Sequence, residues 1–334
     1  MDSLEICAGA GGQALGLACA GFHHVALVEN DKSACETLRY NRPEWNVLEE
    51  DLLQFDGRPY KGIDLLAGGV PCQPFSNAGQ QMGKEDERDL FPEAIRLAEE
   101  TQPKVIMLEN VRGLLDKKFE EYRNYILSRF NELGYVGEWH LVQAAGYGVA
   151  QLRPRSILVV LKPEIEPYFS WPTPFETKAP TVGEALADLM AEDGWENAKN
   201  WAREAKTIGP TIVGGSKKHG GADLGPTRAK KQWAALGVDG KGVANEPPQP
   251  GFEGMPRLTN QMVARLQGFP DSWHFRGKKT PAYRQIGNAF PPPVAEALGI
   301  QIKKAIHASE KALKDNEKAL ENSEKKEVLI KLGD

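Results

Sequence analysis

Cysteine is scarce in this chain of 334 residues, and all four cysteines fall in the first quarter of the sequence: Cys7, Cys19, Cys35 and Cys72. None has the Cys-x-x-Cys spacing of a zinc knuckle or ribbon, and four scattered thiols do not form a disulfide framework. We therefore predict no metal site and no disulfide scaffold.

Long apolar runs are also missing, because no stretch reaches the roughly 18 residues that a membrane span needs. The first five residues, Met-Asp-Ser-Leu-Glu, include acids where a secretory signal has basic residues and a long apolar core. We expect a cytoplasmic protein that does not contact a membrane.

An excess of positive charge is the third feature that is lacking, since the net charge is −5. This value excludes attraction of nucleic acid to the whole surface, but not to a local patch. Residues 206–241 contain seven lysines or arginines and only two acids. The positive charge is therefore concentrated in one segment.

The composition is that of a globular chain, with 41% hydrophobic and 26% charged residues. The length predicts about two domains. Up to about residue 165, short apolar runs alternate with longer amphipathic stretches, which predicts an α/β fold with a mostly parallel sheet. The expected strands are 4–8, 25–28, 45–48, 63–67, 105–108, 139–142 and 157–161, and the expected helices are 14–20, 32–40, 90–100 and 119–133.

From about Trp171 the chain is interrupted by proline, glycine and tryptophan, which indicates a smaller, loop-rich domain. Helical patterns return at residues 259–267 and 293–306, and the tail is rich in charge of both signs. We found no internal repeat. The expected division is 1–172, a catalytic and cofactor-binding domain; 173–278, the small domain; 279–307, a return to the first domain; and 308–334, a charged helix or tail.

Residues that follow the first three expected strands predict a site for an adenosine-containing cofactor. The turn Gly9 to Gly12 allows backbone N–H groups to approach a ligand at a helix N-terminus. Glu29 lies where an acid accepts hydrogen bonds from ribose, and Asp51 could accept from the adenine amine. A dinucleotide stays open as an alternative although position 14 is alanine, and so does a tight turn without a ligand.

Three later motifs place reactive side chains beside this turn. Cys72 lies between prolines after the fourth strand, which makes it a candidate nucleophile, and a structural thiol stays open as the alternative. Glu109 directly follows an apolar strand, so partial burial would raise its pKa and allow it to donate a proton. A salt bridge to a nearby arginine is the alternative. Arg153 and Arg155 point the same way in an extended segment and suit phosphate or carbonyl oxygens.

Four ordered motifs closely resemble those of DNA cytosine-5 methyltransferases: Gly-Gly-Val-Pro-Cys-Gln-Pro-Phe-Ser at 68–76, Glu-Asn-Val at 109–111, Gln-Leu-Arg-Pro-Arg at 151–155 and Tyr-Arg-Gln-Ile-Gly-Asn-Ala-Phe-Pro-Pro-Pro-Val at 283–294. The resemblance extends from Leu4 to about Gly299. It implies a Rossmann-like methyltransferase fold, with residues 173–278 as a target-recognition domain. It also implies base flipping, double-stranded DNA as partner and a monomeric enzyme of the modification or orphan type.

The resemblance implies a role for each matching residue. Cys72 would add to C6 of cytosine, and Glu109 would protonate or hydrogen-bond N3. Arg155 would hold O2, and Arg153 would lie near the sugar-phosphate or the thiolate. S-adenosyl-L-methionine, with S-adenosyl-L-homocysteine as product, would contact Cys7, Ala8, Gly9, Gly11, Gly12, Glu29, Asn30, Asp51, Leu52, Pro71, Leu90, Asn288, Ala289 and Phe290. Cys7 departs from the pattern, because many relatives have phenylalanine there.

The DNA contacts implied by the same resemblance are spread over two segments. Residues 76–88 would form a loop that closes on the flipped nucleotide, and the basic segment would contact backbone or bases. Single lysines in it could equally serve solubility. The residues are Ser76, Gln80, Arg88, Thr211, Gly214, Lys217, Lys218, Arg228, Lys230 and Lys231.

Rival functions fit the sequence less well. A zinc cytosine deaminase needs Pro-Cys-x-x-Cys, which is missing after Cys72. A nicotinamide oxidoreductase leaves the cysteine, the glutamate and the arginine pair without a role. A DNA-binding regulator without catalysis is disfavoured because Cys72, Glu109 and Arg155 are all present, and RNA as substrate is disfavoured by the separate small domain.

Overall fold

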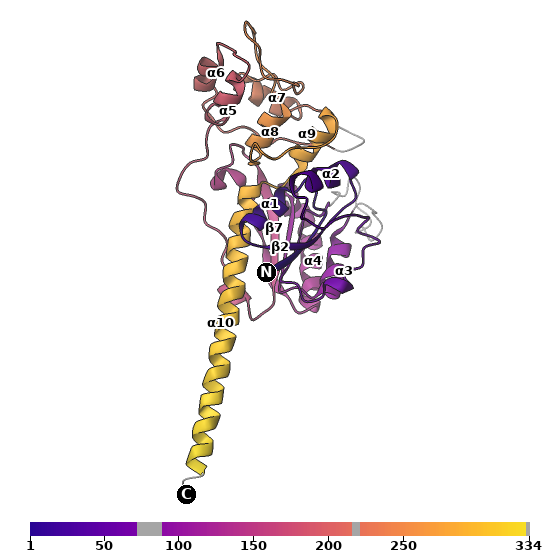
Figure 1. Ribbon diagram of the computed structural model, residues 1–334, viewed down its shortest axis with the longest axis vertical. Helices are drawn as coiled ribbons and strands as arrows, with labels where there is room; N and C mark the ends of the chain where they lie inside the picture. Colours follow the sequence, from indigo (N-terminus) through magenta and orange to yellow (C-terminus); the bar gives the residue numbers. More distant parts are fainter. Residues whose placement is uncertain (72–88, 216–220, 332–334) are drawn as a thin grey trace.

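A seven-stranded sheet forms the centre of the protein in a computed structural model that describes residues 1–71, 89–215 and 221–331 (Figure 1). The order of its strands is β3-β2-β1-β4-β5-β7-β6. Their bounds are β1 (Asp2–Ile6), β2 (His23–Glu29), β3 (Val47–Glu49), β4 (Leu65–Gly68), β5 (Val105–Val111), β6 (Val136–Gln143) and β7 (Pro154–Leu161).

The first five strands in the chain pair in parallel with one another, whereas β7 lies between β5 and β6 and runs antiparallel to both. Parallel strands bring their carboxyl ends to one edge of a sheet, where open α/β folds bind their ligands. The residues that follow β1, β2 and β4 therefore meet at this edge.

Helices cover both faces of the sheet, as the alternation of side chains along β5 requires. Val105 and Met107 pack with residues of α1 (Gly12–Cys19) and α10 (Pro292–Lys331). Ile106 and Leu108 face the other way and pack with α3 (Phe91–Thr101) and α4 (Glu120–Glu132). This double burial explains why the strand is apolar throughout.

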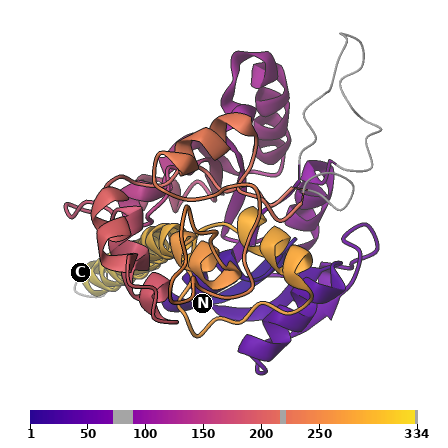
Figure 2. The ribbon, with the colours of Figure 1, turned by 90° about the horizontal axis from the view of Figure 1, so that it is seen from above.

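The small region lies at the top of Figure 1 and is held to the first domain by a shared apolar core. Trp233 and Leu266 of this region belong to the same buried cluster as Leu15 and Leu38. In Figure 2 the orange segment around residues 260–290 lies over the indigo N-terminal strands. The remaining helices are α2 (Lys32–Asn41), α5 (Val182–Ala191), α6 (Ala198–Glu204), α7 (Thr227–Ala234), α8 (Asn260–Leu266) and α9 (Lys279–Asn288). Short 3₁₀ helices are η1 (Arg58–Tyr60), η2 (Arg112–Leu115), η3 (Lys117–Phe119), η4 (Ala144–Tyr147) and η5 (Glu166–Tyr168).

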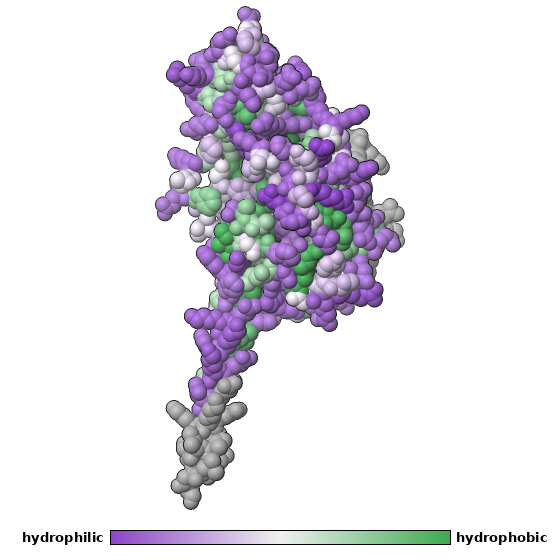
Figure 3. Space-filling view, in the orientation of Figure 1, coloured by the Kyte–Doolittle hydropathy of each residue, from purple (hydrophilic) through white to green (hydrophobic). Residues whose placement is uncertain are grey.

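Helix α10 packs on the sheet with its first half and then extends away from the body (Figure 1). Ile302 and Ile306 are fully buried, whereas Leu313 is 50% and Leu320 is 64% exposed. The coloured portion of the projecting part, nearer the body, is mostly hydrophilic on the face seen in Figure 3. In the described part of the chain, no helix is both long and apolar enough to cross a membrane.

The seven expected strands and their chain order are confirmed, with shifts at their ends. One prediction was wrong in a way that concerns function: the fifth strand was expected to end at Leu108, but β5 continues to Val111 and contains Glu109. Pairing with β7 extends the strand this far. The sequence also failed to predict α5, α6 and α7, because the small region is rich in proline and glycine, and it did not predict α9.

His24 joins β2 to the start of α1 through a buried hydrogen-bond chain. Its Nδ1 lies 2.9 Å from the Ser3 hydroxyl and its Nε2 lies 2.8 Å from the Ala14 carbonyl oxygen. The carbonyl can only accept, so Nε2 carries a proton, and the Ser3 hydroxyl can donate to Nδ1 of the neutral ring. Burial lowers the pKa of His24 from 6.5 to about 4.

This lowered pKa predicts a pH-dependent stability. The folded state disfavours protonation, so the contribution of the neutral ring is complete above pH 6.5 and is lost as the pH falls toward about 4. Between pH 6.5 and pH 4, the unfolding free energy of the wild type should fall by about 3 kcal/mol more than that of the His24→Gln variant. Urea denaturation at both ends of the window measures the difference, and equal losses would contradict the assignment.

Candidate active site

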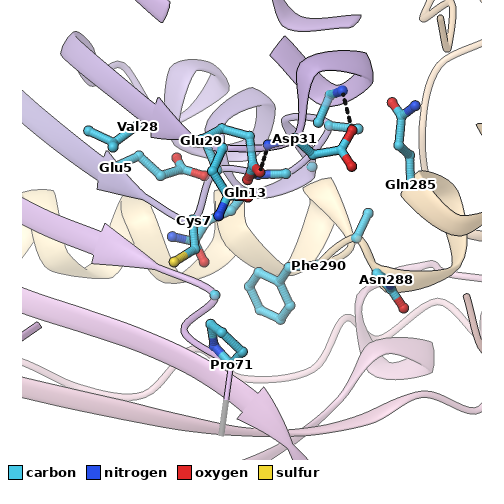
Figure 4. Close-up of a pocket in the computed structure, with 18 of the residues that line it drawn as sticks. Glu5, Cys7, Gln13, Val28, Glu29, Asp31, Pro71, Gln285, Asn288 and Phe290 are labelled. Atoms are coloured by element: carbon cyan, nitrogen blue, oxygen red, sulfur yellow. Dashed lines mark hydrogen bonds between the residues drawn. The ribbon is translucent and has the colours of Figure 1, made fainter. Parts of the chain in front are cut away.

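A cavity of about 300 Å³ lies at the carboxyl edge of the parallel strands (Figure 4). Its walls come from both ends of the chain. The turn after β1 and the residues after β2 and β4 form one side, and the end of α9 with Phe290 forms the other. The volume is at the lower end of the range typical for small-molecule sites.

Most residues that we expected to bind the cofactor line this cavity. They are Cys7, Ala8, Gly9, Gly12, Glu29, Asn30, Leu52, Pro71, Leu90, Asn288, Ala289 and Phe290, and Glu109 lies among them. Residues that were singled out in motifs about 280 positions apart in the sequence therefore line the same cavity.

Gly11 and Asp51 are expected cofactor residues that the structure places outside the lining. Gly11 has a φ of 86°, and a Cβ atom there would lie 2.6 Å from a methyl carbon of Leu38 and 2.9 Å from the ring of Trp273. It therefore permits close packing beneath the turn. Asp51 is exposed, its carboxylate accepts the Leu53 N–H at 3.1 Å, and its neighbour Glu50 lines the cavity.

The turn after β1 depends on glycine for close packing and on Glu29 for its hydrogen bonds. A Cβ atom on Gly12 would lie 2.2 Å from the Phe290 carbonyl oxygen, so only glycine fits there. The two carboxylate oxygens of Glu29 accept N–H groups of Gly9 at 2.8 Å and Asp31 at 2.7 Å. Each oxygen keeps a lone pair for a further donor, such as a ligand hydroxyl.

Glu109 and Arg155 form a buried ion pair beside the cavity. They are diagonal neighbours across β5 and β7, and the Arg155 Nε lies 2.7 Å from the Glu109 Oε1. Both residues are only 9% exposed. Burial raises the pKa of the Glu109 carboxyl, although the charges of Arg155 and Arg153 act in the opposite direction. The raised pKa that we expected and the alternative of a salt bridge to an arginine therefore occur at the same carboxyl.

The segment that leads to Cys72 lies against this pair. The Asn110 side-chain amide donates to the Val70 carbonyl at 2.8 Å, and a Cβ atom on Gly69 would lie 3.3 Å from the Glu109 Oε2. Pro71 lines the cavity. Cys72 follows Pro71 in the sequence but lies outside the described residues, as do Ser76, Gln80, Arg88, Lys217 and Lys218.

Cys7 is a thiol in the cavity wall with properties unlike those of a nucleophile. Burial raises its pKa, and the nearby carboxylates Glu29 and Asp51 raise it further. A thiol that stays protonated is unreactive, because the thiolate is the attacking form. Cys7 is therefore a lining residue.

Arg153 was expected near the sugar-phosphate or the thiolate, and the structure buries it completely. Its two Nη atoms donate to the backbone carbonyls of Ile212, Gly287 and Ala289. Within the described part of the chain, its Nε has no hydrogen-bond partner.

The described DNA-binding candidates differ in their surroundings. Arg228 and Lys231 are exposed on α7, whereas the Lys230 Nζ lies 2.8 Å from the Asp223 carboxylate. The Thr211 hydroxyl donates to the Leu152 carbonyl. Gly214 is buried against α9, where a Cβ atom would lie 2.6 Å from the Asn288 Oδ1.

Sequence reasoning missed several polar residues of the cavity. Gln13 and Glu5 are 4% and 1% exposed, and both Gln13 amide atoms and the Glu5 Oε2 have no hydrogen-bond partner among the described residues. Buried polar groups are normally bonded, so these atoms suit a polar ligand or water. The sequence feature that could have revealed them is a polar residue within an apolar strand or helix on each side of the glycine turn. The other missed lining residues are Ala10, Val28, Asp31, Ala34, Glu50, Gly69, Arg284 and Gln285.

The described residues contain no group of three or more histidines, cysteines or acids that could hold a metal ion.

Comparisons with known proteins point to one family. The family model of the C-5 cytosine-specific DNA methylases matches residues 1–304. The chain is 61% identical over 307 residues to the type II methyltransferase M.NgoMIV of Neisseria gonorrhoeae, covering 91% of this chain and 97% of that protein. It is 56% identical over 313 residues to the type II methyltransferase M.NaeI of Lentzea aerocolonigenes, covering 92% and 76% respectively.

Solved structures share the fold at lower identity. A prophage-encoded DNA modification methyltransferase of E. coli superimposes with a TM-score of 0.65 at 23% identity and covers 92% of this chain and 99% of its own. The DNMT2 protein of Spodoptera frugiperda gives a TM-score of 0.61 at 16% identity, covering 91% and 99%. The family model matches residues 1–304, and the two relatives are 61% and 56% identical in sequence. This chain therefore belongs to the C-5 cytosine-specific DNA methylases.

Proposed function

We propose that this chain transfers a methyl group from S-adenosyl-L-methionine to C5 of a cytosine flipped out of duplex DNA, as the modification enzyme of a restriction-modification pair. The observation that carries the proposal is the buried Glu109–Arg155 pair next to Pro71, which precedes Cys72. Family membership supports the same reaction class.

The cavity suits S-adenosyl-L-methionine in shape and chemistry. Gly12 lets the turn pack against the Phe290 carbonyl oxygen, where any side chain would collide, and Glu29 offers acceptors for ribose hydroxyls. Leu52 and Leu90 would flank the adenine, and the unpartnered Gln13 amide adds a polar contact. When bound, this donor supplies the methyl group.

The reaction needs a nucleophile because C5 of cytosine is too poor in electrons to attack a methyl sulfonium. The Cys72 thiolate adds to C6, and the electrons of the C5–C6 double bond move into the ring. Glu109 delivers a proton to N3 and stabilises this adduct. Arg155, fixed by Glu109, would hold the O2 atom with its remaining N–H donors.

The adduct then collapses to product. After C5 has gained the methyl group, its proton leaves to water, the C5–C6 double bond re-forms and the C6–S bond breaks, which returns the Cys72 thiolate. N3 gives its proton back to the Glu109 carboxylate, so the enzyme and the cytosine ring regain their starting protonation states. Since no side chain of the described cavity lining identifies itself as the base for this proton, water is the acceptor that we propose.

Access to C6 requires the cytosine to leave the base stack, at a cost of a few kcal/mol. Positive side chains of the small region would offset this cost by contacting phosphates. Arg228 and Lys231 are exposed on α7 and suit this role.

Cys72→Ala tests the nucleophile. The variant should lose methyl transfer entirely, because alanine cannot add to C6, while its affinity for duplex DNA is retained. A filter assay with tritiated donor and a parallel gel-shift measurement follow the two properties, and Cys19→Ala, at an exposed cysteine, serves as control. Full activity of Cys72→Ala would refute the mechanism.

A duplex with 5-fluorocytosine at the target position should trap the protein covalently. Fluorine cannot leave C5 as the proton does, so elimination stops and the C6–S bond persists. Intact-mass spectrometry should show an adduct of protein and DNA strand in the presence of the methyl donor. An unchanged protein mass would count against thiolate addition.

Glu109→Gln should lower the rate about a hundredfold or more, because glutamine cannot transfer a proton. The pKa of Glu109 is raised, so the carboxyl stays protonated to higher pH than usual and the wild-type rate falls as the pH passes above that pKa. The residual rate of Glu109→Gln should lack this alkaline fall. Single-turnover rates from pH 5 to 9 test both expectations, and an unchanged profile in the variant would exclude Glu109 as the acid.

A further inference from the structure

Arg153 holds three separate carbonyl groups with one buried guanidinium. Its Nη1 donates to the Ile212 carbonyl at 2.7 Å, and its Nη2 donates to those of Gly287 and Ala289 at 2.9 Å each. The side chain is fully buried. A planar fork of donors fixes the positions of all its acceptors relative to one another.

The three acceptors belong to two functional parts of the protein. Ala289 lines the cavity between Asn288 and Phe290. Ile212 lies in the segment 209–215, which belongs to the small region and connects α6 to the segment that leads to α7. Arg153 thus connects the wall of the cavity to the beginning of the basic segment.

Two buried glutamines complete a closed ring of hydrogen bonds around this connection. The Gln151 Oε1 accepts the Ile212 N–H at 2.8 Å, and its Nε2 donates to the Gln267 Oε1 at 2.6 Å. Gln267 in turn donates to the Ala289 carbonyl at 2.6 Å. The hydrogen bonds of a buried network polarise and support one another, so a displacement at one member affects the others.

A direct contact runs alongside the ring. The Asn288 side-chain amide donates to the Gly215 carbonyl at 3.1 Å. Gly214 packs so closely on α9 that a Cβ atom would lie 2.5 Å from the Arg284 carbonyl oxygen. The cavity wall and the segment 209–215 therefore cannot move independently.

We propose that Arg153 is a positioning residue that couples occupancy of the cofactor cavity to the placement of the target-recognition region on DNA. This inference rests on the proposed function. A ligand that presses on Ala289 and Phe290 shifts or stiffens the carbonyls that Arg153 holds, and the same guanidinium passes the effect to Ile212. DNA bound by the recognition region acts back on the cavity to the same extent.

The test is the affinity for duplex DNA with and without S-adenosyl-L-homocysteine, measured by fluorescence anisotropy with a catalytically silent Cys72→Ala background. The background protein should bind DNA about tenfold more tightly with the ligand, within the usual range of coupling between sites. Adding Arg153→Lys should reduce this ratio to about twofold or less, because lysine has a point charge and no fork. Each binary affinity should change less than the ratio.

Arg265→Lys is the matched control, since Arg265 also donates to a backbone carbonyl, that of Ala185, but contacts neither the cavity nor segment 209–215. It should keep the tenfold ratio. If Arg153→Lys does not fold, Gln267→Met removes the second donor to the Ala289 carbonyl and should lower the ratio as well. A purely structural role would lower both affinities and leave their ratio unchanged.

Two outcomes overturn the inference: a ratio of one in the background protein, or an unchanged ratio in both network variants. Neither outcome affects the proposed reaction, which depends on methyl transfer by the wild type. Conversely, a wild type that transfers no methyl group would refute the proposed function, whatever the ratio.

Discussion

The buried pair of Glu109 and Arg155 is the interaction on which the active edge of the sheet depends. It exists because β7 runs antiparallel to β5, which places the two side chains diagonally across neighbouring strands. Removing either partner would leave a buried charge, which costs several kcal/mol. Burial nonetheless outweighs the arginine charges and raises the pKa of Glu109, so one carboxyl can be both anchored and protonated.

The cavity beside this pair is assembled from the two ends of the chain. Helix α10 packs closely on α1, where a Cβ atom on Gly16 would lie 2.2 Å from the Pro292 carbonyl oxygen. This contact brings the end of α9 against the glycine turn, and Gly12 then meets Phe290. Small residues at these two points set how near the walls approach and therefore the size of the cavity.

The sequence predicted the strands, and it singled out most residues of the cavity lining together with Glu109 and Arg155, because each leaves a local pattern: apolar runs, a glycine turn, or a charged residue next to a strand. It did not predict that Arg153 would be fully buried, since its acceptors are backbone carbonyls as far away in the chain as Ala289. The exclusion of Asp51 from the lining follows from a local turn at Leu53 that composition does not reveal. Helices α5, α6 and α7 were not predicted because the glycines and prolines between them dominate the sequence pattern of this region.

The position of the new methyl group tests this account most directly. Duplex DNA treated with the protein and S-adenosyl-L-methionine, digested to nucleosides and separated by mass spectrometry, distinguishes methylation at cytosine C5 from methylation at exocyclic nitrogens. A thiolate that activates C5, with an acid at N3, predicts 5-methylcytosine as the product. Methyl groups on cytosine N4 or adenine N6, or unmodified DNA, would contradict it.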